Sequence, residues 1–461
     1  MKKTASLILA TLLSASLWAD DLNSECQKVK NYLKKTYSSN QASYSIQINK
    51  LNRIINSNQS EKDKLAALKK EFPHLYNSWQ KELDAAKAVG IEFSADNKTL
   101  IKCPKNISEV IIPSCVTKIG DKAFEGCDLK NITIPNSVTA IGESAFAYCL
   151  LKSITIPNSV TTIGDWVFSS CFCLTSVTLP DSITTISGGM FYQCSGLTNV
   201  TIPDSIITIK WRAFEGCSSL TSITLPNSVT TIGAGAFEYC SGLTSLTIPN
   251  SVTTIGGRAF DGVVTVAENH PVFMVDKAGA LFDVNKGIMI NLPKNYQGHY
   301  TIPDGVTTIG ERAFYYCKNL KSVTLPNSVT RIGREAFANC SSLTSVNIPD
   351  GVTKIDGSAF SRCSSLTSVT IPNSVTTIGW YAFTHCSSLK SVNIPDSITT
   401  IEEHLFSFCS SLKNVNIPNS VTTIGRDAFY KCSSLKSVSI SRKTKYEKNS
   451  FPEGCKITVR D

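Results

Sequence analysis

The sequence predicts an α/β-type repeat solenoid, a stack of short parallel β-strands with turns and short helical or 3₁₀ segments, preceded by a small α-helical N-terminal segment. Prolines recur every 22 or 23 residues, and the same apolar pattern surrounds each of them. One unit is too short to bury that pattern alone, so identical units must stack. The prolines form two series, Pro113, Pro135, Pro157, Pro180, Pro203, Pro226 and Pro249, and then Pro303, Pro326, Pro349, Pro372, Pro395 and Pro418.

Each unit divides into three pieces, as Leu220–Cys240 (LTSITLPNSVTTIGAGAFEYC) illustrates. Ile223–Leu225 alternates apolar and polar residues and is rich in β-branched types, which predicts a short strand that Pro226 ends. Asn227 and Ser228 have turn chemistry. The following apolar positions point inward again, and the Ala-Phe pair packs a short helical or 3₁₀ segment against the core. With parallel strands about 4.8 Å apart, thirteen or fourteen rungs give a body roughly 65 Å long.

The unit resembles a leucine-rich repeat, and in detail it is similar to the BspA-like subfamily of bacterial surface proteins. The hallmark IP-x-x-V-x-x-I-G-x-x-AF-x-x-C-x-x-L of that subfamily is present nearly verbatim in Ile417–Leu435 (IPNSVTTIGRDAFYKCSSL). The resemblance covers about residues 91–461. It implies a leucine-rich-repeat-like fold and a secreted or surface-attached protein of the adhesin type, since BspA-like members are associated with binding extracellular-matrix proteins of the host and with bacterial coaggregation.

The chain divides into six parts. Lys2 and Lys3, the apolar run Leu7–Leu17 and then Ala19 are typical of a secretory signal peptide. No later stretch is long and apolar enough to span a membrane. The parts are a signal peptide (1–19), a helical N-terminal segment (20–90), an N-terminal cap with seven leucine-rich repeats (91–260), an irregular long repeat (261–300), six leucine-rich repeats (301–438) and a C-terminal cap (439–461).

The N-terminal segment lacks the repeat. It has apolar residues at helical spacing, and Ser60 with Asp63 resembles a helix-capping signal. We therefore expect two or three helices, which cap the solenoid, act as a spacer or oligomerise.

The irregular long repeat still alternates apolar and polar residues, with Gly279 and Gly287 as turns, and this predicts a hairpin. Its second half resembles residues 91–112, with Cys103-Pro104 set against Leu292-Pro293. We therefore expect residues 91–112 to cap the N-terminal end of the solenoid, because an open apolar end would aggregate.

Seventeen cysteines in an exported protein first suggest disulfides. Twelve of them, however, follow the Phe of the unit by three residues, which predicts inward ladders of buried thiols. Cys103 with Cys115, and Cys173, are better candidates for bridges, and Cys26 for a link between two chains. No C-x-x-C pair or His–Cys cluster accompanies the ladder, so we expect neither metal nor cofactor. The twelve are Cys127, Cys149, Cys171, Cys194, Cys217, Cys240, Cys317, Cys340, Cys363, Cys386, Cys409 and Cys432.

Catalysis and nucleic-acid binding have little support. The five histidines are scattered and lie in no nucleophile or zinc motif, so we do not expect an enzyme. The net charge is +9, but residues 91–461 carry 31 Lys/Arg against 28 Asp/Glu, which does not suggest the clustered basic face that nucleic acid requires.

Variation between the repeats indicates where a partner binds. The outward strand positions are nearly constant Thr or Asn, which favours a uniform polar sheet face, although such an array could also bind a repetitive ligand such as glycan or ice. The positions beside the Phe vary and gather aromatic residues, which are enriched at interface hot spots. These rings either pack over the neighbouring rung or form a binding ridge. The candidate ligand-binding residues are Trp166, Trp211, Tyr239, Tyr315, Tyr316, Trp380, Tyr381, Phe408 and Tyr430.

Together these patterns predict a non-catalytic, exported leucine-rich repeat protein, located in the periplasm, at the cell surface or outside the cell. The expected activity is adhesion to matrix or cell-surface proteins of a host, or to other bacteria, with a glycan as a further candidate partner. The alternative is a structural or spacer module of the cell envelope that oligomerises through residues 20–90.

Overall fold

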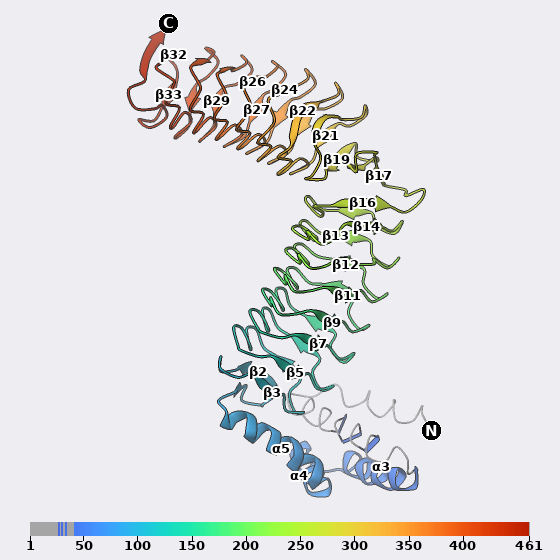
Figure 1. Cartoon of the computed structure of the whole chain (residues 1–461). Helices are drawn as coiled ribbons and strands as arrows, with labels where there is room; N and C mark the ends of the chain where they lie inside the picture. Colours follow the sequence, from blue (N-terminus) through green and yellow to red (C-terminus); the bar gives the residue numbers. More distant parts are fainter. Residues whose placement is uncertain (1–25, 28, 31–32, 35–40, 461) are drawn as a thin grey trace.

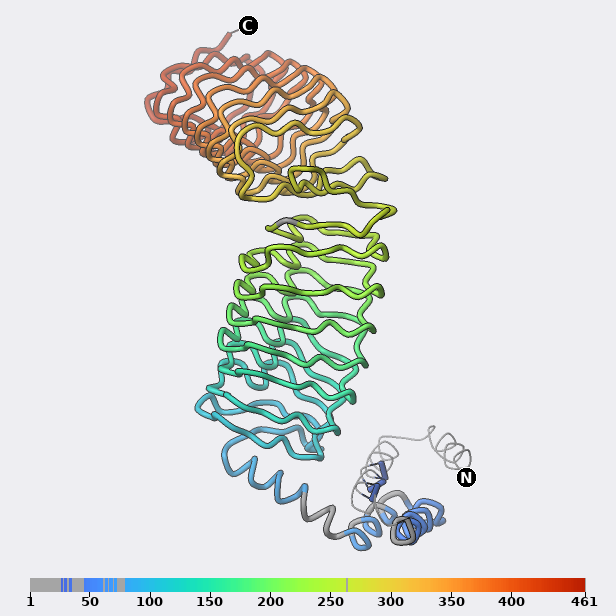
Figure 2. Tube along the Cα trace, turned by 45° about the vertical axis from the view of Figure 1, so that its right-hand side comes forward, coloured from blue at the N-terminus to red at the C-terminus, as the bar shows by residue number. Residues whose placement is uncertain are grey.

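The computed structural model describes residues 26–27, 29–30, 33–34 and 41–460. The chain forms an elongated stack of rungs, with a helical segment at its N-terminal end (Figure 1). Figure 2 shows two arrays of rungs, and the direction of the stack changes between them near residues 260–300. We call these the first array (91–266) and the second array (273–460). The signal peptide predicted at residues 1–19 lies outside the described residues.

Three described helices precede the first array: α3 (Gln41–Ile55), α4 (Glu61–Glu71) and α5 (Pro73–Ala88). The capping signal of α4 is confirmed, because the Ser60 hydroxyl accepts a hydrogen bond from the Asp63 amide at 3.2 Å. Helix α5 packs on the first rungs, where Leu83 belongs to the solenoid core. The Glu82 carboxylate accepts hydrogen bonds from the Ser114 amide and hydroxyl, each at 2.9 Å. Helix α5 therefore covers the end of the solenoid.

Most strands belong to two series. The first series carries mostly Ser, Thr or Asn on its outward side and comprises β3 (Glu109–Ile111), β5 (Asn131–Thr133), β7 (Ser153–Thr155), β9 (Ser176–Thr178), β11 (Asn199–Thr201), β14 (Ser245–Ile248), β16 (Val263–Val266), β20 (Gly298–Thr301), β22 (Leu320–Thr324), β24 (Ser345–Asn347), β26 (Ser368–Thr370), β28 (Ser391–Asn393), β30 (Asn414–Asn416), β32 (Ser437–Ser441) and β34 (Lys456–Arg460).

The second series ends mostly in Ile and consists of β2 (Thr99–Lys102), β4 (Lys118–Ile119), β6 (Ala140–Ile141), β8 (Thr162–Ile163), β10 (Thr185–Ile186), β12 (Thr208–Ile209), β13 (Thr231–Ile232), β15 (Thr254–Ile255), β19 (Ile288–Asn291), β21 (Thr308–Ile309), β23 (Arg331–Ile332), β25 (Lys354–Ile355), β27 (Thr377–Ile378), β29 (Thr400–Ile401), β31 (Thr423–Ile424) and β33 (Lys445–Tyr446). The remaining strands are β1 (Glu92–Phe93), β17 (Phe273–Val275) and β18 (Leu281–Asp283).

Within each series most neighbouring strands pair in parallel and in register, one rung to the next, and each series is divided into several sheets. This pairing confirms the predicted solenoid. The strand predicted at Ile223–Leu225 is not formed, although Ile223 and Leu225 are buried and Thr224 is exposed. The first series is interrupted there, between the sheets that end at β11 and begin at β14. The second series stays paired through β12, β13 and β15, and it holds these rungs together.

The segment around each core Phe is a run of overlapping turns rather than the predicted helical or 3₁₀ segment. In one unit the amides of Ala123, Glu125 and Cys127 close turns onto carbonyls three residues earlier. The intervening amides of Lys122 and Phe124 instead donate to carbonyls of the next rung at 2.8 Å. Because alternate amides are needed for bonds between rungs, a continuous helix cannot form.

The core is built from a ladder of phenylalanines, one in each rung. Within each array consecutive rings stack, with centroids 4.5 to 5.8 Å apart. The ladder breaks between Phe260 and Phe314, where the two arrays meet, and their apolar cores form two separate clusters. The rings that are fully buried are Phe124, Phe146, Phe168, Phe191, Phe214, Phe237, Phe314, Phe337, Phe360, Phe383, Phe406 and Phe429.

The predicted cysteine ladder is confirmed. All twelve cysteines are buried, and ten of their thiols donate to the Phe carbonyl of the preceding rung at 3.0 to 3.2 Å. The first thiols of the two arrays donate instead to the cap residues Cys103 and Leu292. Burial raises the pKa of Cys194 to about 12, which keeps the thiol protonated.

The disulfide predictions are not supported. Cys103 is a free, buried thiol next to Cys127, and the Cys115 thiol faces the Asn97 carbonyl, so they form no bridge. Cys26 is buried in the small core of the helical segment, where it is inaccessible to a second chain. Cys173 is exposed and free.

The predicted hairpin is present between the arrays, where β17, β18 and β19 pair antiparallel. Strand β18 is buried on both faces. Its side chains alternate: Leu281 packs into the core of the first array, whereas Phe282 packs into the core of the second. Because neighbouring residues of a strand point to opposite faces, one hairpin closes both cores.

The candidate binding ridge

The turns that surround the core Phe form a ridge along the solenoid, which we define as the three residues before and the two after each Phe. The residue two positions before the Phe and the residue two positions after it have positive φ in nearly every rung. Tyr381, His385 and Phe408 lie there with φ between 59° and 62°. All described non-glycine residues with positive φ are ridge residues except Asn97 and Asn269.

Glycine occupies the same left-handed position in other rungs, for example at Gly126, Gly189, Gly216 and Gly235. An L-residue loses roughly 1 kcal/mol in this conformation, whereas glycine adopts it readily. Rungs with Trp, Tyr, Phe, His or Arg at these positions therefore keep a large side chain where glycine would be more favourable. Such local strain indicates a functional use of the side chain.

The ridge of the first array carries an aromatic cluster of Trp166, Tyr192 and Trp211. The Trp166 ring lies edge-to-face against Trp211 at 5.0 Å and against Tyr192 at 5.2 Å. Beneath them, a Cβ atom added at Gly188 or Gly189 would collide with the indole rings. The two tryptophans therefore pack directly against the backbone of these two glycines, and Trp211 stays 40% exposed.

The ridge of the second array carries a larger aromatic cluster. Tyr381 stacks on His404 at 4.5 Å, and one position along, His385 stacks on Phe408 at 4.3 Å. Trp380 extends the cluster at one end and Tyr430 at the other, each by an edge-to-face contact. Trp380, Phe408 and Tyr430 are 46%, 39% and 38% exposed. The cluster forms a rigid surface that is aromatic on its outside.

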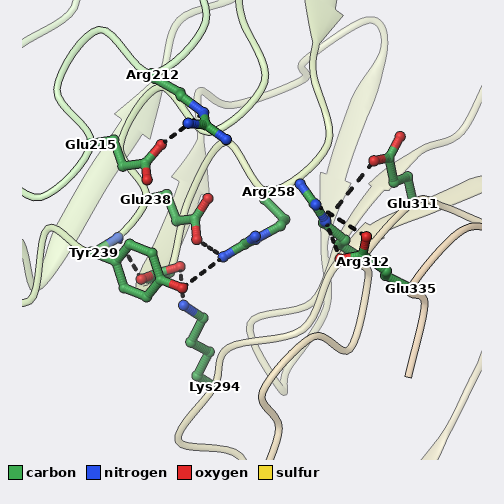
Figure 3. A network of polar contacts seen from close by, with 10 residues as sticks. Arg212, Glu215, Glu238, Tyr239, Arg258, Lys294, Glu311, Arg312 and Glu335 are labelled. Carbon is green, nitrogen blue, oxygen red and sulfur yellow. Dashed lines mark hydrogen bonds and ion pairs between the residues drawn. The ribbon is translucent and has the colours of Figure 1, made fainter. Parts of the chain in front are cut away.

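Tyr239, Tyr315 and Tyr316 lie where the two arrays meet. The Arg258 guanidinium pairs with Glu238 and donates to the Tyr239 hydroxyl at 3.1 Å (Figure 3). It also lies over the Tyr315 ring at 4.0 Å. Arg258 comes from the end of the first array and Tyr315 from the start of the second, so this contact holds the arrays together.

An ion pair also crosses the same junction. Lys294 contacts Asp261 at 2.6 Å and lies over the Tyr239 ring at 4.4 Å. Burial raises the pKa of Tyr239 to about 12 and lowers the pKa of Lys294, although Asp261 favours the charged ammonium. The neighbouring Arg312 binds Glu335 through two hydrogen bonds of 2.7 and 3.2 Å. Tyr239 and Tyr315 thus have structural partners at the junction.

The structure places the nine candidate residues in three groups. Trp166 and Trp211 belong to the first cluster, and Trp380, Tyr381, Phe408 and Tyr430 to the second. Tyr239, Tyr315 and Tyr316 lie at the junction. The candidate residues predicted from the sequence did not include His385 and His404, since the histidines are scattered and lie in no known motif. Their offset of two residues from the core Phe was the signal that places them on the ridge.

His404, Ser407 and Asp427 resemble a nucleophilic triad in composition, with His404 3.2 Å from the Ser407 hydroxyl and 3.8 Å from the Asp427 carboxylate. Ser407 is only 1% exposed, and its hydroxyl donates to the Asp427 carbonyl at 2.6 Å. A substrate cannot reach this oxygen, and its proton is already engaged. The three residues therefore serve packing.

No described group of three His, Cys, Asp or Glu residues is placed to hold a metal ion. In the described part of the chain, no helix combines the length and the apolarity needed to cross a membrane.

The repeat matches the pattern of the BspA type leucine rich repeat region over residues 96–220, 162–269, 295–394 and 358–459. These overlapping matches extend over most of both arrays. The chain belongs to the BspA-type leucine-rich repeat family. Leucine-rich repeat proteins are generally protein-interaction modules.

Solved structures of other leucine-rich repeat proteins resemble this BspA-type chain. One from Eubacterium ventriosum ATCC 27560 is 25% identical over 80% of this chain and 92% of its own, with a TM-score of 0.51. One from Bacteroides ovatus ATCC 8483 is 28% identical over 80% and 90%, with a TM-score of 0.38. A leucine rich cell surface protein from Faecalibacterium prausnitzii A2-165 is 26% identical over 78% and 94%, with a TM-score of 0.45. No curated protein matches the chain significantly.

Proposed function

We propose that this protein is an exported, non-catalytic binding protein of the bacterial surface, and that it adheres to matrix or cell-surface proteins of a host or to other bacteria. The observation that carries this proposal is the retention of large aromatic side chains at left-handed ridge positions, such as Tyr381 and Phe408, where other rungs have glycine. Their exposed rings form two preorganised surfaces, and aromatic residues dominate the energetics of protein interfaces.

The helical segment supports this proposal over that of an oligomerising spacer. Helix α5 contributes Leu83 to the core and binds Ser114 through Glu82, so its buried face is already used to cap the first array. The two aromatic clusters lie on other rungs than those that this helix covers, on an extended stack long enough for a standard interface of about 800 Å² per partner.

The test is a binding screen of the mature chain (residues 20–461) against immobilised matrix proteins and whole bacterial cells. The triple variant Trp211→Ala, Trp380→Ala and Tyr381→Ala should lose binding by at least about 30-fold, because hot-spot residues contribute about 2 kcal/mol or more each. The matched control replaces three outward threonines of the constant sheet face, Thr201, Thr247 and Thr370, by Ala and should bind as the parent does. Unchanged binding of the ridge variant to every ligand of the parent would contradict the proposal.

A further inference from the structure

Residues at the same position of successive repeat units form a column along the stack. In one such column the residue type changes from threonine to lysine at the C-terminal end of the second array. The residue directly after the Leu is threonine at Thr344 and Thr367, and then lysine in three successive rungs, at Lys390, Lys413 and Lys436. The threonine hydroxyls each donate to a carbonyl of the preceding rung at 3.2 and 3.1 Å. The lysine rungs lack this hydroxyl and its hydrogen bond, so the substitution is not explained by stacking.

The three lysines, which we call the lysine column, are exposed and consecutive. The Lys413 amide donates to the Lys390 carbonyl at 2.9 Å, and the turn before Lys436 is bonded to the preceding rung by the Ser434 amide, which donates to the Ser410 carbonyl at 3.2 Å. The lysines therefore lie one rung apart, a spacing of about 4.8 Å. None of the three ammonium groups forms an ion pair within the described residues, and the Lys436 ammonium donates only to the Ser433 carbonyl. Like charges at this spacing repel each other and destabilise a sheet.

The surroundings of the lysine column add positive charge and hydrogen-bonding groups. Lys456 lies on the last strand, in register with Ser437, and residues 436–460 contain seven Lys/Arg against two Asp/Glu. The outward residues of the adjoining strands are all neutral and polar: Ser391, Asn393, Asn414, Asn416, Ser437 and Ser439. The Asn416 amide donates to the Asn393 side chain at 2.7 Å, which aligns these two residues along the stack. This face therefore lacks the carboxylates that would neutralise the column.

We propose that the lysine column binds a linear sulfated polysaccharide that runs parallel to the axis of the solenoid. A pyranose ring is about as long as the spacing between two rungs, so a polymer with an anionic group on each sugar places one charge opposite each lysine. Binding releases the counterions of the polymer and removes the repulsion between the lysines. The neighbouring Ser and Asn side chains supply donors and acceptors for the sugar hydroxyls.

The chemistry of this face distinguishes the polysaccharide from nucleic acid. Proteins that bind single-stranded nucleic acid combine a basic groove with aromatic side chains on which the bases stack. The outward residues of strands β28, β30 and β32 include no aromatic residue. The site lies in a different column of the unit from the aromatic ridge, so it does not depend on the function proposed above.

The experiment measures binding of the mature chain to heparin at physiological ionic strength, and repeats it over a range of salt concentrations. The variant Lys390→Thr, Lys413→Thr and Lys436→Thr restores the residue that the same column has at Thr344 and Thr367, so it should fold as the parent does. We expect it to bind heparin at least about 10-fold more weakly, and to lower the slope of log K against log salt by about three.

The matched control is Lys130→Thr, Lys152→Thr and Lys321→Thr, which removes the same charge from the same position of the unit in rungs outside the lysine column. This variant should keep the affinity of the parent. An equal loss in both variants, no loss in the first, or no heparin binding by the parent would overturn the proposal. Tighter binding to single-stranded or duplex DNA than to heparin would also overturn it, because the ligand class would then be wrong.

Discussion

The two arrays share one unit and differ in what that unit carries. In both, the Phe rings stack, the Cys thiols donate to Phe carbonyls and a hairpin or helix closes an end of the core. The first array packs Trp166 and Trp211 against glycines and keeps threonine after the Leu in its later rungs. The second array stacks Tyr381 on His404 and changes that threonine to lysine. Binding chemistry can therefore change wherever a side chain does not reach the core.

The largest expected effect concerns the independence of the two arrays. Phe360 is fully buried in the middle of the second Phe ladder, and Phe360→Ala should destabilise that array by about 4 kcal/mol, because it removes a large apolar side chain and leaves a cavity. Since the two cores are separate clusters, urea denaturation should show two transitions, of which only the one belonging to the second array moves. Phe191→Ala should produce the reverse pattern. A single transition that shifts equally in both variants would show that the arrays unfold as one unit.

A somewhat smaller effect is expected at the junction that separates the arrays. Arg258→Ala leaves Glu238, which is 4% exposed, without its cation. Removing one partner of a buried ion pair costs about 3 kcal/mol. We expect the urea transition of the first array to move to lower concentration and to separate further from that of the second. Arg334→Ala is the matched control, because Arg334 is exposed and lies over the Trp380 ring instead. Equal small shifts in both variants would contradict a structural role for Arg258.

Much of the scaffold was predictable from the sequence, because it depends on spacing alone. A Phe and a Cys that recur every 22 or 23 residues must stack once parallel strands are in register, and alternation around Gly279 indicated the hairpin. That the hairpin closes the cores of both arrays was not predicted. Its strand β18 is apolar on both faces, with Leu281 in the core of the first array and Phe282 in that of the second. The sequence does not show that a separate core lies on each side of this strand.

The candidate site was predictable only in part. The positions beside the Phe were identified, but the left-handed backbone at Tyr381 and Phe408 was not, because glycine appears there in only some rungs. The junction contacts of Tyr239 and Tyr315 depend on Arg258 and Lys294, which are far apart in sequence from each other. The lysine column was not predicted, because the positive and negative charges over residues 91–461 nearly balance. Its three lysines are 23 residues apart in sequence and become neighbours only in the folded stack.

The most direct test of a binding role for the ridge combines stability and affinity in one variant. In Tyr381→Gly with Phe408→Gly, relief of the left-handed backbone offsets the lost ring contacts, so the unfolding free energy should change by less than about 1 kcal/mol per site. The control Ser170→Gly with Ser358→Gly alters the same backbone positions without removing a ring. We expect the aromatic variant to keep the stability of the parent and to lose its partner, while the control keeps both. Lower stability with unchanged partner binding would show instead that these rings serve the fold.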